Sequence, residues 1–160
     1  MAMNAIGQLL SIDDIVLDLD VADKGGVLEA IAARISRYHG LAYDDVLQDL
    51  AARERLGSTG LGHGVAIPHA RMSQCGAEAG VFIRTRVPVP FDAPDRKPVS
   101  MFLGLVVPKQ AAEHHLQLLA AAANIFGDRT LRQSLATASD PAAVRALLAA
   151  WPEADRDPRR

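Results

Sequence analysis

The sequence contains little of what marks several large classes of protein. Its 160 residues include a single cysteine, Cys75, so it can form no internal disulfide and offers no paired thiolates for a metal site. The 17 basic and 19 acidic side chains leave a net charge of −2, which gives nucleic acid no surplus of positive charge to bind. No apolar run approaches the roughly 18 residues typical of a membrane span, and residues 1–10 lack the features of a secretory signal. We therefore expect a cytoplasmic protein with no membrane insertion and no nucleic-acid partner.

What is present is an ordinary globular composition with strand and helix patterns in alternation. Hydrophobic residues make up 49% and charged residues 22%, a balance typical of a domain with a buried core. Apolar alternation and short apolar runs predict strands over residues 15–20, 65–67, 80–86 and 99–107. Apolar stripes with capping residues predict helices over residues 24–39, 44–56, 112–126, 131–138 and 141–151. The patterns predict one α/β domain over residues 1–151 and a polar tail over residues 152–160.

The apolar stripes also predict which side of each helix faces the core. The expected inward residues are Val27, Leu28, Ile31, Ile35 and Tyr38 in the first helix, Val46, Leu47 and Leu50 in the second, and Leu116, Leu119, Ala123 and Phe126 in the long alanine-rich helix.

The segment from Gly57 to His69 is a glycine-rich loop followed by a short apolar run and the dipeptide Pro68-His69. Proline fixes a backbone dihedral next to an imidazole whose ordinary pKa is about 6.5, so the ring is nucleophilic at neutral pH. Glycines allow positive φ, and successive N–H groups in such a loop can form an anion-binding concavity. A stiffly held histidine beside an anion-binding loop is suited to phosphoryl transfer through a phosphohistidine.

Two other kinds of ligand are disfavoured by the same residues. Gly57 and Gly62 have the spacing of a nucleotide-binding P-loop, but His63-Gly64 stand where lysine and serine or threonine are needed, and the loop follows a helix. His63, His69 and His115 raise a zinc alternative, yet they lack a helical i, i+4 pair and paired cysteines. We expect no nucleotide cofactor and no metal.

Several residues near the loop are candidates for holding the phosphoryl oxygens. Arg53-Glu54-Arg55 would ordinarily form a solvated helix face, but the chain turns from it directly into the loop, so a guanidinium here could reach an anion at His69. His115 begins the long helix, where the helix N-terminus favours negative charge. His114 adjoins it, and because neighbours on a helix are about 100° apart, only one of the two rings can face His69. The loop offers donors through Ser58, Thr59, Gly62 and Gly64.

These residues carry a family resemblance. Arg53-Glu-Arg-Leu-Gly-Ser-Thr59 and Gly62-His-Gly-Val-Ala-Ile-Pro-His69 resemble the signature of IIA domains of the bacterial phosphotransferase system, mannitol/fructose class. Phe91-Asp-Ala and His115-Leu-x-x-Leu119 match further blocks of that family, and the resemblance covers about residues 8–150. Ile15-Val-Leu-x-Leu and Lys24-x-x-x-Leu28 resemble its nitrogen-regulatory branch.

The resemblance implies a mixed β-sheet flanked by helices and a phosphorylation site. In that family the histidine after the proline accepts a phosphoryl group from the phosphohistidine of a small carrier protein, which makes His69 the acceptor. The family's supporting arginine corresponds to Arg53, and its second active-site histidine to His115. The implied partners are the carrier protein and either regulated proteins, in a nitrogen-related relay, or a sugar-specific IIB domain during uptake.

Overall fold

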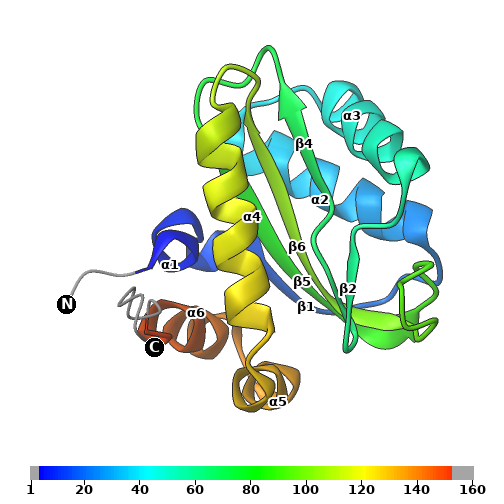
Figure 1. The fold of residues 1–160 in the computed structure, drawn as a ribbon, viewed down its shortest axis with the longest axis vertical. Coiled ribbons are helices and arrows are strands. Elements are labelled where there is room, and N and C mark those ends of the chain that lie inside the picture. The colour runs from blue at the N-terminus through cyan, green and yellow to red at the C-terminus, as the bar shows by residue number, and fades with distance from the viewer. Residues whose placement is uncertain (1–3, 153–160) are drawn as a thin grey trace, which may run out of the picture.

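A six-stranded mixed β-sheet forms the centre of the fold (Figure 1). The structure is a computed structural model that describes residues 4–152. Its strands are β1 (Ile15–Leu19), β2 (Gly60–Gly62), β3 (Val65–Ala66), β4 (His69–Met72), β5 (Ala79–Val89) and β6 (Val99–Pro108). Its helices are α1 (Ala5–Leu9), α2 (Lys24–His39), α3 (Tyr43–Leu56), α4 (Ala112–Phe126), α5 (Arg129–Thr137) and α6 (Pro141–Ala150), with a 3-10 turn over Ile12–Asp14. Within residues 4–152 we find no helix long and apolar enough to span a bilayer.

The strand order is β1-β5-β6-β3-β2, and β4 pairs with β6 farther along the same edge as β3. The pairings of β1 with β5 and of β3 and β4 with β6 are parallel, whereas β5 with β6 and β2 with β3 are antiparallel. The mixed sheet flanked by helices is therefore confirmed. The polar tail expected over residues 152–160 lies, beyond residue 152, outside the described part of the chain.

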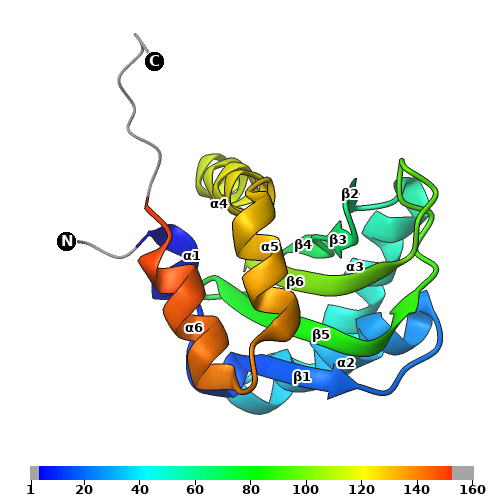
Figure 2. The same ribbon diagram turned by 90° about the horizontal axis from the view of Figure 1, so that it is seen from below.

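Helices cover both faces of the sheet, which separates two apolar cores (Figure 2). One core lies under α2 and α3, and the other under α1, α4, α5 and α6. Strand β6 serves both, because Phe102 and Val106 point into the first while Leu103 and Leu105 point into the second. Burial on both faces explains why residues 99–107 are almost continuously apolar.

The helix boundaries follow the predicted capping signals. The Asp23 side chain accepts a hydrogen bond from the N–H of Gly26 at the start of α2, and Gly40 ends that helix with φ of 74°. Helix α6 begins with Pro141 in its first turn, after Asp140, whose carboxylate accepts from the N–H of Ala143. Each of these two helices begins where an aspartate side chain accepts a hydrogen bond from one of its free N–H groups.

Two predictions about inward faces are wrong. In α4, Leu116 is 66% exposed and Ala123 is exposed as well, and the buried residues are His115, Leu118, Ala122, Ile125 and Phe126. Leucine and alanine occupy most positions of α4 from Leu116 to Ala123, so the apolar stripe does not define a single inward face. Packing against the sheet determines which of these residues are buried. Tyr38 of α2 is likewise 40% exposed, at the solvent end of its stripe.

Candidate functional site

His69 is the first residue of β4, an edge position that the sequence patterns did not reveal. The strand pairs in parallel with β6, in register from His69 with Leu105 onward, and the N–H of Leu105 donates to the carbonyl of Pro68 at 2.9 Å. Ala70 and Met72 face the core under α2 and α3. Because side chains alternate along a strand, His69 and Arg71 project together from the opposite face. The proline-linked histidine is thus held by the sheet and not by a free loop.

One ring nitrogen of His69 is used in a hydrogen bond to the backbone, and the other is free to act as the nucleophile. Nδ1 lies 2.8 Å from the carbonyl oxygen of Ile67, which can only accept, so Nδ1 carries the proton and donates. The neutral ring then has its lone pair on Nε2. Burial lowers the pKa of His69 below its usual value, and the positive charge of Arg53 lowers it further. The hydrogen bond to Ile67 and the negative charge of Glu54 raise the pKa, but they do not cancel the effect of burial. At neutral pH the ring is a neutral nucleophile at Nε2.

His115 of α4 is the histidine that meets His69. Their ring centroids are 5.2 Å apart, and His115 is only 8% exposed. Burial, followed by the charges of His69, Arg71 and Arg53, lowers the pKa of His115 to about 4, so this ring is neutral at neutral pH. Its buried Nδ1 has no hydrogen-bond partner among the described residues. An unpaired acceptor is tolerated better than an unpaired N–H, which favours the proton on Nε2 and makes that nitrogen a donor.

The neighbouring His114 turns away from the site. Its Nε2 lies 3.2 Å from Oε1 of Glu78, and both side chains are well exposed. The rotation of about 100° between consecutive helical residues accounts for the difference. Helix geometry alone left open which of the two rings faces His69; in the structure it is the ring of His115.

A cavity of about 660 Å³ opens beside His69, between α3 and α4. It is lined by Asp49, Ala52, Arg53, Leu56, His69, Ala70, Arg71, Lys109, Ala112, His115, Leu116 and Leu119. Three of these side chains are cations and one, Asp49, is an anion, so the charged groups of the lining give an anion bound at His69 a net positive environment. Leu56, which is 85% exposed, and Leu116 give the same opening an apolar rim.

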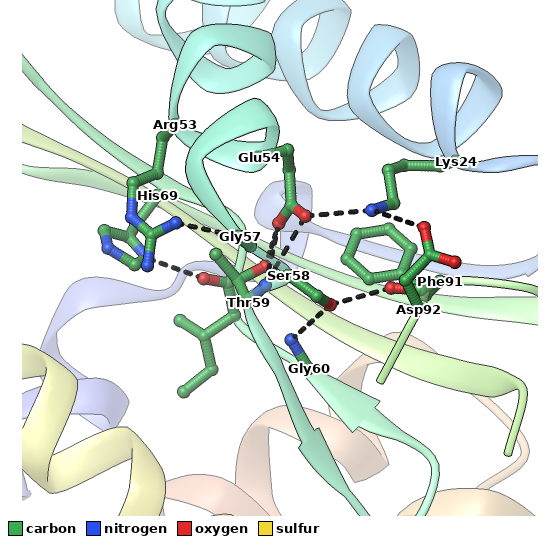
Figure 3. Close-up of polar contacts among 11 residues, drawn as sticks. Lys24, Arg53, Glu54, Gly57, Ser58, Thr59, Gly60, His69, Phe91 and Asp92 are labelled. Carbon is green, nitrogen blue, oxygen red and sulfur yellow. Dashed lines mark hydrogen bonds and ion pairs between the residues drawn. The ribbon is translucent and has the colours of Figure 1, made fainter. Parts of the chain in front are cut away.

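Arg53 lies in the last turn of α3, where its Nη1 donates to the carbonyl of Gly57 at 2.8 Å (Figure 3). This bond satisfies a carbonyl at the helix end and holds the guanidinium beside the loop. The charge of Arg53 lowers the pKa of both His69 and His115. The guanidinium therefore belongs to the same electrostatic environment as the two rings, while its contact with a bound anion stays a prediction.

The four predicted phosphate-binding loop residues lie outside the lining of this cavity. Ser58 Oγ donates to the carbonyl of Phe91 at 2.7 Å, and the Thr59 hydroxyl donates to Glu54. Gly62 and Gly64 adopt φ of 87° and 79° at the turn between β2 and β3. In this geometry the loop uses these groups to hold its own shape. Their contact with phosphate stays a prediction that requires the loop to turn its donors toward the cavity.

Sequence reasoning missed three residues of this region. Arg71 and Lys109 line the cavity, and Arg71 could have been found by applying the two-residue period of a strand from His69. Glu54 was expected on a solvated face, but it is only 7% exposed. A carboxylate inside a protein is costly unless it is paired or hydrogen-bonded, so the burial of Glu54 implies specific partners.

The two lowered pKa values predict a pH dependence. Neutral His69 exists above its pKa, and a lowered pKa extends this reactive form to more acid solution. In an NMR titration of the imidazole resonances, assigned with a His69→Gln variant, we expect the His69 midpoint below 6.5 and that of His115 near 4. A His69 midpoint at or above 6.5 would contradict the burial and charge arrangement described here.

Comparisons with known proteins agree with this fold. Residues 8–151 match the family described as phosphoenolpyruvate-dependent sugar phosphotransferase system, EIIA 2. A nitrogen regulatory protein of Pseudomonas aeruginosa is 36% identical over 137 residues, covering 85% of this chain and 89% of that protein. The crystal structure of nitrogen regulatory protein IIA-Ntr from Neisseria meningitidis superposes with a TM-score of 0.86 at 46% identity, covering 91% of this chain and 99% of that one.

A second similar structure contains a partner protein. It is the complex of enzyme IIAMTL and phosphorylated enzyme IIBMTL from Escherichia coli, with a TM-score of 0.75. It is 21% identical and covers 88% of this chain and 96% of the other, so the likeness is one of fold.

Proposed function

The chain belongs to the phosphoenolpyruvate-dependent sugar phosphotransferase system EIIA 2 family, and from this premise we propose that it accepts a phosphoryl group on His69 from a phosphorylated histidine-containing carrier protein. The observation that carries the proposal is the state of the His69 ring. Its Nδ1–H is committed to Ile67, and its Nε2 is left free in a cavity that also contains Arg53 and His115.

The transfer would be an in-line exchange of one N–P bond for another. The lone pair on Nε2 of His69 attacks phosphorus while the bond to the donor imidazole breaks, and that imidazole leaves with the electron pair. The positive charge that grows on the His69 ring is stabilised by the Ile67 carbonyl, which accepts from Nδ1–H. Arg53 and the neutral His115 would donate to the three equatorial oxygens, where charge is concentrated. Neither a nucleotide nor a metal enters this scheme.

We further propose that phosphorylation serves regulation in a nitrogen-related relay, by changing which proteins the chain binds. The support is that similar proteins along most of the chain are named nitrogen regulatory proteins. The alternative is a sugar-uptake component that passes the group to a IIB domain, the kind of partner seen with the more distant IIAMTL. A cytoplasmic location remains part of the proposal, because direct transfer requires this protein to be in the same compartment as the carrier protein.

Mass spectrometry and an acceptor assay separate these functions. Incubation with the phosphorylated carrier should add a single acid-labile phosphoryl group to the intact protein. The phosphorylated and unphosphorylated forms should then bind a regulated partner with different affinity, and transfer onward to isolated IIB domains should be slow. No mass gain would contradict phosphoryl acceptance, and rapid transfer to a IIB domain would favour uptake.

A further inference from the structure

We propose that Glu54, a buried carboxylate that lies beside Thr59 (Figure 3) and outside the cavity, is a positioning residue for His69 that acts through Thr59 and Ile67. The inference rests on the proposed role of His69 as phosphoryl acceptor. It concerns a residue that has no contact with the phosphoryl group, and its effect is to decide which ring nitrogen of His69 is free.

The burial of Glu54 is compensated by a set of donors. Its side chain is 4% exposed and lies 3.2 Å from the ammonium of Lys24, which sits over the ring of Phe91. Oε1 of Glu54 accepts from the N–H of Thr59 at 3.2 Å and from the Thr59 hydroxyl. An ion pair inside a protein persists only with such additional hydrogen bonds. Three donors therefore converge on one carboxylate, which anchors the loop to the end of α3.

From Thr59 the connection continues to the reactive ring through two backbone contacts. The carbonyl of Thr59 accepts from the N–H of Ile67 at 3.1 Å, and the carbonyl of Ile67 accepts from Nδ1–H of His69 at 2.8 Å. On the other side, the Pro68 carbonyl accepts from Leu105 of β6. The peptide that holds the imidazole is thus fixed by the sheet on one side and by the Glu54-anchored loop on the other.

The loop needs this anchor because its backbone is adaptable. Gly57, Gly62 and Gly64 adopt φ of 156°, 87° and 79°, in the positive range that glycine reaches readily. Glycines give up much conformational freedom when they are fixed, so a charged anchor next to them favours one loop conformation. Without it, the Ile67 carbonyl would be held less firmly, and His69 could place its proton on either nitrogen.

A carboxylate fits this position better than its neutral analogue. Glutamine has one acceptor oxygen and an NH₂ group that would face the Lys24 ammonium or the Thr59 N–H, both of which are donors. The Glu54 charge also raises the pKa of His69, which opposes the effect of Arg53. Glu54→Gln therefore changes the anchor while keeping its size.

The test compares Glu54→Gln with Glu29→Gln, an exposed glutamate of α2. Long-range ¹H–¹⁵N NMR of the imidazoles reports which nitrogen of His69 carries the proton, without any phosphoryl donor. In Glu54→Gln we expect a mixture of the two His69 tautomers and phosphoryl transfer slowed roughly 10- to 100-fold, the scale of a small misplacement of a reactive group. Glu29→Gln should match the parent in both measurements.

The outcomes separate this inference from the proposed function. A folded Glu54→Gln variant with the parent's tautomer and rate overturns the role of Glu54 and leaves phosphoryl acceptance intact. A parent that gains no phosphoryl group, with a tautomer shift in Glu54→Gln, overturns the function and leaves the positioning role standing. If circular dichroism shows that Glu54→Gln is unfolded, Thr59→Val tests the inference in its place. That substitution removes only the hydroxyl donor to Glu54. A parent-like tautomer and rate in Thr59→Val would then overturn the inference.

Discussion

His69→Ala is expected to abolish phosphoryl acceptance. The variant lacks the nucleophile, and loss of a nucleophile in other covalent catalysts costs on the order of 10⁴-fold or more in rate. His115 cannot take over although its ring centroid lies 5.2 Å from that of His69, because the lone pair of its neutral ring is on Nδ1, which is buried away from solvent. Intact-mass measurement after incubation with the phosphorylated carrier should show the acid-labile gain in the parent and none in the variant.

The matched control for this substitution is His114→Ala. His114 is a surface histidine of α4 whose partner is Glu78, so its loss should leave the mass gain and the transfer rate as in the parent. The two variants should therefore differ completely, with no mass gain in His69→Ala and a full mass gain in His114→Ala. A His69→Ala protein that still gained the group would place the acceptor elsewhere and would remove the basis for the roles of Arg53 and His115.

The fold was predictable where the local chemistry and the packing agree. Helices α2 and α6 have aspartate caps, and β6 is apolar on both faces, so each could be placed from its own residues. The short elements α1, β2 and β4 were missed, because segments of five, three and four residues carry too few positions to show a period. Strand β4 exists because β6 offers its free edge, a tertiary cause that no local pattern contains.

The arrangement of residues around His69 was predictable to a similar depth and for similar reasons. His69 and Arg53 could be named because a proline-linked histidine and a helix-end arginine flank the same glycine loop. The choice of His115 over His114 depended on the rotation of α4 against the sheet, which its run of leucines and alanines does not encode. Glu54 was overlooked because it stands between two arginines in the sequence, although its side chain turns inward to Thr59.

Arg53→Lys is expected to slow phosphoryl transfer about ten- to a hundred-fold, which corresponds to a lost charge-assisted hydrogen bond of roughly 1.5–3 kcal/mol. The substitution keeps the positive charge but replaces a fixed fork of donors with a single flexible ammonium. One arm of the Arg53 guanidinium already donates to Gly57, which orients the remaining donors beside His69. A lysine cannot hold the helix end and contact two phosphoryl oxygens together. Single-turnover transfer from the phosphorylated carrier measures the effect.

Two comparisons identify geometry as the cause of that loss. Arg55→Lys alters an exposed residue of the same helix turn and should transfer at the parent's rate. The pKa of His69, which the charge of Arg53 lowers, should stay unchanged in Arg53→Lys and rise in Arg53→Gln, where the charge is gone. A slow Arg53→Lys variant with an unchanged His69 pKa would therefore assign the loss to the shape of the guanidinium. Equal rates for the parent and Arg53→Lys would show that the phosphoryl oxygens are held by another cation of the cavity, of which Arg71 is the nearest along the strand from His69.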